Sequence, residues 1–79
     1  MNFEEGWFRF NNLPLDKIFR VLSEHYDVTF LFDENMNTRQ LYSINFRTGE
    51  TDEIIAFLEH AIDIEIEKTG ATQYLIKPN

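Results

Sequence analysis

Histidine and carboxylate side chains are the groups in this chain that could support catalysis or metal binding. The two histidines, His25 and His60, lie 35 residues apart, and neither has a second ligand at the spacing of a metal pair. There is no cysteine, which excludes disulfides and thiolate zinc sites. His25 falls in the apolar stripe of a predicted helix and is expected at the edge of the core. His60 is expected on a solvated helix face.

Two pairs of aspartates recur at equivalent places, which favours structural roles for them. Asp16 and Asp52 each fall in the first turn of a predicted helix, where the helix dipole stabilises an anion. Asp27 and Asp63 each stand where a helix gives way to a strand, a position at which aspartate forms turns. Helix ends and turns therefore account for all four carboxylates.

A ladder of carboxylates follows along "IDIEIE", where Asp63, Glu65 and Glu67 share one face of a predicted strand. These groups could hold a cation, but a solvated face that discourages edge pairing is the expected role. The sequence has no glycine-rich phosphate loop and no Ser, Thr or Cys beside a His at a recognisable spacing. We therefore expect no enzyme activity, no metal and no cofactor.

Length and charge narrow the function further. The 79 residues are expected to form one domain, 1–79, with a core rich in aromatic side chains. The formal charge of −7 opposes binding to nucleic acid or to anionic membrane surfaces, because both carry phosphate. No apolar run is long enough to span a bilayer, and the N-terminus lacks a signal-peptide pattern. Any export or anchoring segment is expected upstream, outside this chain.

The sequence contains an internal repeat. The stretch "FRFNNLPLDKIFRVLSEHYDVTF" (8–30) returns without a gap as "INFRTGETDEIIAFLEHAIDIEI" (44–66), at a constant offset of 36 residues. Most other apolar positions match in kind. The identical pairs are Phe10 and Phe46, Asp16 and Asp52, Ile18 and Ile54, Leu22 and Leu58, and Asp27 and Asp63.

Each repeat is predicted to be a strand, a helix and a strand. Repeat one covers about 7–32, repeat two about 43–67, and a closing strand about 72–77. We expect "NNLP" to turn the chain, Thr48 or Gly49 to cap the second helix, and Gly70 to centre a hairpin turn. A right-handed crossover is expected within each unit. The other predicted bounds are strand 7–10, helix 14–25, strand 28–32, connection 33–40, strand 42–47 and strand 62–67.

The apolar stripe of each predicted helix is unusually wide. In both repeats it covers an arc of about 160°, more than a helix resting on one surface needs. A sheet above and another below would cover such an arc. The residues in the arcs are Leu15, Ile18, Phe19, Val21, Leu22, His25 and Tyr26, and then Ile54, Ile55, Phe57, Leu58, Ala61 and Ile62.

Outward-facing residues are the candidates for contact with a partner. By alternation, Trp7 and Arg9 face outward from the first strand, Leu31 from the second and Leu75 from the last. Trp7 either packs under the lead-in segment against Phe3 or belongs to an exposed patch that meets a partner. Open sheet edges would also suit strand addition.

Phe8 and Phe10, the stretch "NNLPL", the step "HYDVTF" and the strand "IDIEIE" together carry a known pattern. By this pattern, residues 3–77 resemble the C-terminal domain of FecR-type anti-sigma regulators of the Bacteroidetes kind. The resemblance runs through "GWFRFNNLPLDKIFRVLSEHYDVTFLFDENM" and "YSINFRTGETDEIIAFLEHAIDIEIEKTGATQYLIK". Gly6 and Tyr26 fit the family pattern, whereas Phe3 stands where a Trp is usual. The domain is also similar to the short N-terminal (STN) signalling domain of secretins and TonB-dependent transporters.

The resemblance implies an α+β fold, with two helices between two small β-sheets. It also implies a non-catalytic, periplasmic domain of an inner-membrane-anchored regulator. Its partner would be the N-terminal signalling domain of a TonB-dependent outer-membrane transporter, and its signal would pass to an extracytoplasmic-function sigma factor through parts outside this chain. The alternatives are the STN signalling domain of a transporter or secretin and, from another class, a small ligand-binding or catalytic domain with a deep pocket.

Overall fold

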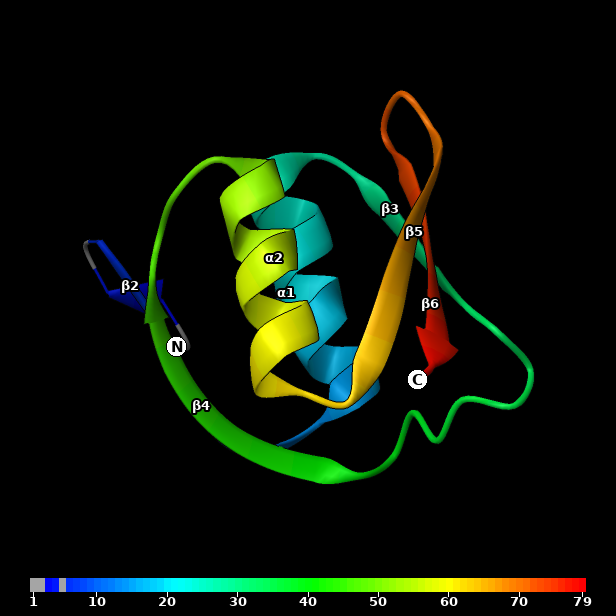
Figure 1. Ribbon diagram of the computed structural model, residues 1–79. Helices are drawn as coiled ribbons and strands as arrows, with labels where there is room; N and C mark the ends of the chain where they lie inside the picture. Colours follow the sequence, from blue (N-terminus) through cyan, green and yellow to red (C-terminus); the bar gives the residue numbers. More distant parts are fainter. Residues whose placement is uncertain (1–2, 5) are drawn as a thin grey trace.

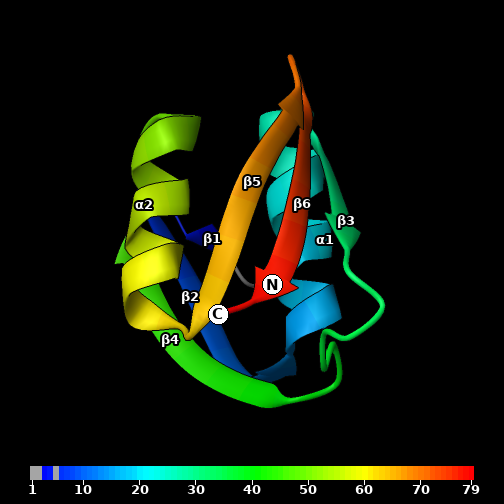
Figure 2. The same ribbon diagram turned by 45° about the vertical axis from the view of Figure 1, so that its right-hand side comes forward.

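Two three-stranded sheets enclose two helices in the computed structural model, which describes residues 3–4 and 6–79 (Figures 1 and 2). The helices are α1 (Leu15–Tyr26) and α2 (Thr51–Ala61). Sheet A consists, in spatial order, of β1 (Phe3–Glu4), β2 (Trp7–Pro14) and β4 (Leu41–Arg47). Sheet B consists of β3 (Thr29–Phe32), β6 (Gln73–Pro78) and β5 (Ile64–Gly70). This α+β sandwich is the fold that the resemblance implies.

The two repeats contribute to the sheets in an unexpected way. Their first strands, β2 and β4, pair antiparallel in sheet A, while their second strands, β3 and β5, flank β6 in sheet B. The prediction of a right-handed crossover within each unit is therefore wrong, because the two strands of a repeat lie in different sheets. The wide apolar arcs explain this, since each helix needs a sheet on both sides and the chain must pass through the helix layer.

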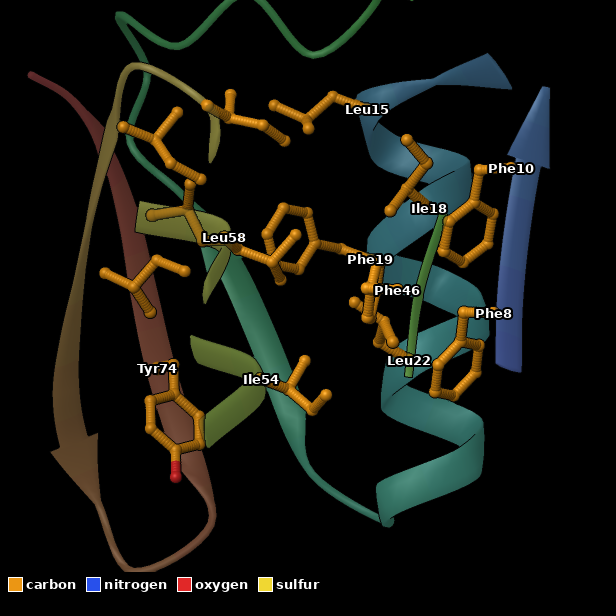
Figure 3. Close-up of a cluster of buried hydrophobic side chains, with 14 residues drawn as sticks. Phe8, Phe10, Leu15, Ile18, Phe19, Leu22, Phe46, Ile54, Leu58 and Tyr74 are labelled. Atoms are coloured by element: carbon orange, nitrogen blue, oxygen red, sulfur yellow. The ribbon is translucent and has the colours of Figure 1, made fainter. Parts of the chain in front are cut away.

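One hydrophobic core fills the space between the layers (Figure 3). Sheet A contributes aromatic rings, the helices contribute mainly aliphatic side chains, and sheet B closes the far side. The core therefore belongs to both repeats together. Its buried members are Phe8, Phe10, Leu15, Ile18, Phe19, Leu22, Phe46, Ile54, Leu58, Ile62, Ile64, Ile66, Tyr74 and Ile76.

The start of α1 differs from the prediction. "NNLP" does not turn the chain, because β2 continues to Pro14 through a register shift after Phe10, with Asn12 at φ 56°. Pro14 is the N-cap, and within the described part of the chain no side chain caps this end. Backbone oxygens of the 33–40 connection replace the cap: Leu15 N–H donates to Gln40 O at 3.1 Å, and Asp16 N–H to Thr38 O at 3.0 Å.

The start of α2 is capped by glutamates. Glu50, rather than Thr48 or Gly49, is the N-cap, and it forms a capping box with Glu53. Glu50 N–H donates to Glu53 Oε1 at 2.9 Å. Both carboxylates also lie at the positive end of the helix dipole. The same two side chains therefore supply both the capping hydrogen bonds and a favourable charge at the start of α2.

The end of α1 fixes the relation between the repeats. Asp27 adopts φ 56° and ψ 48°, which confirms its predicted role in a turn, whereas Asp63 follows an extended cap at Ile62 and has no left-handed φ. The neighbouring Tyr26 hydroxyl donates to Gly49 O at 2.8 Å and accepts from Gly49 N–H at 3.3 Å. One hydroxyl thus ties the end of α1 to the turn that leads into α2.

The C-terminal hairpin joins β5 to β6. Gly70 pairs with Gln73 across the loop, so the turn lies at Ala71 and Thr72 rather than at Gly70 as predicted. Pro78 pairs with Ile64 at the end of β6, where its missing N–H stops the ladder.

Candidate partner-binding surfaces

Trp7 lies on the outer face of sheet A between two arginines. Arg9 and Arg47 place their guanidinium carbons 5.2 Å and 5.0 Å from the centre of the indole ring. The antiparallel register sets Trp7 directly opposite Arg47, which explains the second contact. Both arginines are exposed, and the indole is half-buried between them. The predicted alternative contact with Phe3 involves a side chain outside those that the structure describes.

Leu31 and Leu75 lie together on the outer face of sheet B. They are paired neighbours on the parallel strands β3 and β6, with Leu31 46% exposed and Leu75 half-buried. Glu67 is opposite Leu75 on β5, and its Oε1 accepts a hydrogen bond from Lys77 Nζ at 2.8 Å. This bond raises the pKa of Lys77 above its ordinary value, and charge attraction from Glu65 adds to the effect.

The four predicted interface residues therefore form two pairs rather than one patch. Trp7 and Arg9 lie on sheet A, whereas Leu31 and Leu75 lie on sheet B, on the other side of the helix layer (Figure 1). Trp7 and Leu31 cannot contact one partner surface of ordinary flatness at the same time.

The edges of the sheets differ in how they are protected. At β5, Glu59 of α2 reaches the edge, where its Oε2 accepts a hydrogen bond from Ile66 N–H at 2.9 Å. A carboxylate in that place occupies a donor that another strand would need. The long outer edge of β4 has no such cover among residues 3–4 and 6–79.

Replacing Glu59 by Ala should uncover the β5 edge. Loss of the bond to Ile66 N–H is expected to lower the free energy of unfolding by about 1–2 kcal/mol, a value reduced for the exposure of Glu59. The open edge should also promote self-association. Urea denaturation and sedimentation velocity measure the two effects, with Glu24→Ala on the exposed side of α1 as control. Unchanged stability together with a monomer at every concentration would contradict this role of Glu59.

A groove lies between the C-terminal half of β4 and the start of α2. Its volume is about 410 Å³, and its apolar lining comes from both elements, including Phe46, Ile54 and Phe57. The Phe57 ring packs 5.0 Å from that of Phe46, yet 38% of Phe57 remains exposed. By helical periodicity, Phe57 was predicted in the apolar arc that the two sheets would cover, so its exposure was not predicted. Its counterpart in repeat one is the smaller, half-buried Val21, and this difference in size was the available signal.

Side chains with catalytic or ligand-binding potential are dispersed or already engaged. The His25 ring packs edge-on against Phe8, with centroids 5.0 Å apart, although the residue as a whole is exposed, and His60 is exposed as predicted. Within residues 3–4 and 6–79, no three His, Asp or Glu side chains gather as a metal site. Of the carboxylate ladder, Asp63 Oδ1 accepts from Asn79 Nδ2 at 3.0 Å, and the two glutamates bond Lys77.

Two further hollows open at the surface, and both are small. One, of about 270 Å³, lies between α1 and the free edge of β3, and another, of about 330 Å³, lies near the turn after α1. Both are open to solvent, unlike the enclosed pockets that bury a small ligand.

In the described part of the chain, no helix is long and apolar enough to cross a membrane.

Comparison with known proteins places this fold in a family. The family model described as "FecR, C-terminal" matches residues 7–75, most of the chain. The crystal structure of a protein from Parabacteroides distasonis, described as an anti-sigma factor, superposes with a TM-score of 0.78 and 14% sequence identity over 94% of this chain. The chain spans 34% of the length of that protein. Among curated proteins, none matches the chain significantly.

Proposed function

Because the chain belongs to the FecR C-terminal family, we propose that it is the docking domain of a regulatory anti-sigma factor. In this proposal it is a non-catalytic domain that works in the periplasm. It binds the N-terminal signalling domain of a TonB-dependent transporter and relays that event towards an extracytoplasmic-function sigma factor. The membrane-spanning and sigma-binding parts belong to other segments of the regulator.

The observation that carries this proposal is Trp7 held between Arg9 and Arg47 on an outer sheet face. Tryptophan and arginine dominate the residues that contribute most to binding at protein interfaces. The stacked guanidinium groups hold the indole in one orientation before the partner arrives, which reduces the entropy lost on binding. A purely structural role does not require a tryptophan on an outer sheet face.

The family match favours a regulator over a transporter or secretin module. The surface hollows argue against the alternative of a small ligand-binding domain, because all three are open to solvent rather than enclosed.

Trp7→Ala should weaken binding to the signalling domain of the transporter encoded beside its gene by at least about tenfold. The measurement is isothermal titration calorimetry with both purified domains, and Leu31→Ala on sheet B is the matched control. Absence of binding by the wild-type domain at high micromolar concentration would refute the docking function. Equal binding by wild type and Trp7→Ala would move the interface away from this face.

A further inference from the structure

The outer edge of β4 carries backbone groups that are ready to pair with another strand. Thr48 N–H donates to Gly6 O at 3.1 Å, which shows that this pair is hydrogen-bonded across the ladder with β2. Hydrogen-bonded and non-hydrogen-bonded pairs alternate along an antiparallel ladder. The register Arg47 opposite Trp7 and Asn45 opposite Arg9 therefore directs the N–H and C=O groups of Asn45 and Arg47 to the open edge.

The other open edge, at β3, is less suited to docking. β3 has four residues against seven in β4, so it offers fewer backbone groups. In the groove beside it, Asp16 Oδ1 is buried and has no hydrogen-bond partner among the described residues. The hollow beside β3 is also smaller than the groove beside β4, at about 270 Å³ against about 410 Å³.

An exposed apolar side chain lies beside the C-terminal half of β4. Phe57, in the groove, is 38% exposed, whereas the exposed Leu41 lies at the other end of β4, outside the groove. An apolar side chain seated in the groove would cover Phe57 and contact Ile54. The edge and the groove therefore offer backbone pairing and apolar contact in one place.

The positive charge of Arg47 beside the edge favours an acidic side chain on the face of the incoming strand that points away from the groove. Arg47 stacks on Trp7 on the outer face of sheet A, and among the described side chains it forms no ion pair. Glu53, the acidic residue in the groove, is engaged by Glu50 N–H in the capping box. A strand laid along β4 thus meets an apolar groove on its inner face and an arginine on its outer face.

We propose that β4 accepts, by strand addition, an extended segment of the partner in which apolar and acidic side chains alternate. The apolar side chains enter the groove at Phe57, and the carboxylates bind Arg47 beside Trp7. This inference rests on the proposed function, since the segment belongs to the partner's signalling domain. Beyond the proposed function, it specifies the edge that the partner uses, the face on which its apolar and its acidic side chains lie, and the sequence pattern of the segment.

Two variants test the edge and the groove separately by calorimetry with the signalling domain. Asn45→Pro removes an outward N–H without removing a bond to β2, and Phe57→Glu places a carboxylate in the groove. Each should weaken binding at least about tenfold. Leu31→Glu is the matched control, because it makes the same change of charge at an exposed apolar residue on sheet B. Circular dichroism establishes that each variant is folded. If Asn45→Pro is unfolded, Phe57→Glu still tests the groove, and the amide shifts of Asn45 and Arg47 described next test the edge.

A probe that does not depend on the signalling domain separates the two proposals. A short soluble peptide of alternating leucine and glutamate, added at millimolar concentration, should shift the amide resonances of Asn45 and Arg47. If the wild-type domain and both variants bind the signalling domain equally well, the edge proposal is overturned and the docking function stands. Peptide binding at β4 without binding of the signalling domain would overturn the docking function and the partner proposed here, and would show only that β4 accepts such a strand. A dimer of this chain abolished by Asn45→Pro, with partner binding intact, would make a second copy the occupant and also overturn the proposal.

Discussion

Leu22→Ala and Leu58→Ala should each lower the free energy of unfolding by about 2–5 kcal/mol, within a single cooperative transition. The two leucines occupy equivalent places in the repeats, and both are 0% exposed in the same core. Truncating either leaves a cavity that both halves of the chain line. For comparison, a domain of this size has a total stability of roughly 4–12 kcal/mol.

Urea denaturation followed by Trp7 fluorescence and by far-ultraviolet circular dichroism measures this effect. The two probes should give the same midpoint, because Trp7 reports on sheet A while circular dichroism reports on the whole chain. Lys17→Ala and His60→Ala, at exposed positions of the two helices, are the controls and should change stability little. Separate transitions for the two probes would contradict a single shared core.

Phe8→Ala should lower the free energy of unfolding by about 3–5 kcal/mol, among the largest effects available in this chain. Phe8 is 0% exposed, and its ring lies 5.3 Å from that of Phe46, 5.9 Å from Phe10 and 5.0 Å from His25. Its loss removes contacts with β4 and with the end of α1 together. We expect the variant to be partly unfolded at physiological temperature.

Thermal unfolding of the purified variant measures the loss, with Asn45→Ala on the outer face of the neighbouring strand as control. A change below about 1 kcal/mol for Phe8→Ala would contradict the central place of this ring in the core.

The spacing of apolar residues was sufficient to predict the layers of this fold. The wide stripe through Ile18 and Leu22, repeated at Ile54 and Leu58, indicates helices covered on both sides, and the structure confirms it. Strand partners could not be predicted in the same way. Alternation along a strand determines which side chains face inward, but not which distant strand supplies the hydrogen bonds.

Local details were wrong where side chains had competing roles. Glu50 caps α2 in place of Thr48 or Gly49, because Glu53 lies three residues further on and completes a reciprocal pair. At Asn12, a residue that tolerates positive φ allows β2 to continue where a turn was predicted.

The candidate interface was only partly predictable. Alternation placed Trp7 and Leu31 outward, as the structure shows, but the stacking of Arg47 on Trp7 depends on the register between β2 and β4. Phe57 was predicted in the covered apolar arc because periodicity gives the direction of a side chain and not the extent of the layer that covers it. The groove arises where sheet A ends beside α2, and β4 is its last strand.

Nuclear magnetic resonance titration of the ¹⁵N-labelled domain with the partner's signalling domain tests the docking proposal most directly. The predicted result is perturbation of the Trp7 indole N–H and of the Asn45 and Arg47 amides, with little change at Leu31 and Leu75. Perturbation confined to Leu31 and Leu75 on sheet B, or a spectrum unchanged at saturating concentrations of the signalling domain, would contradict it.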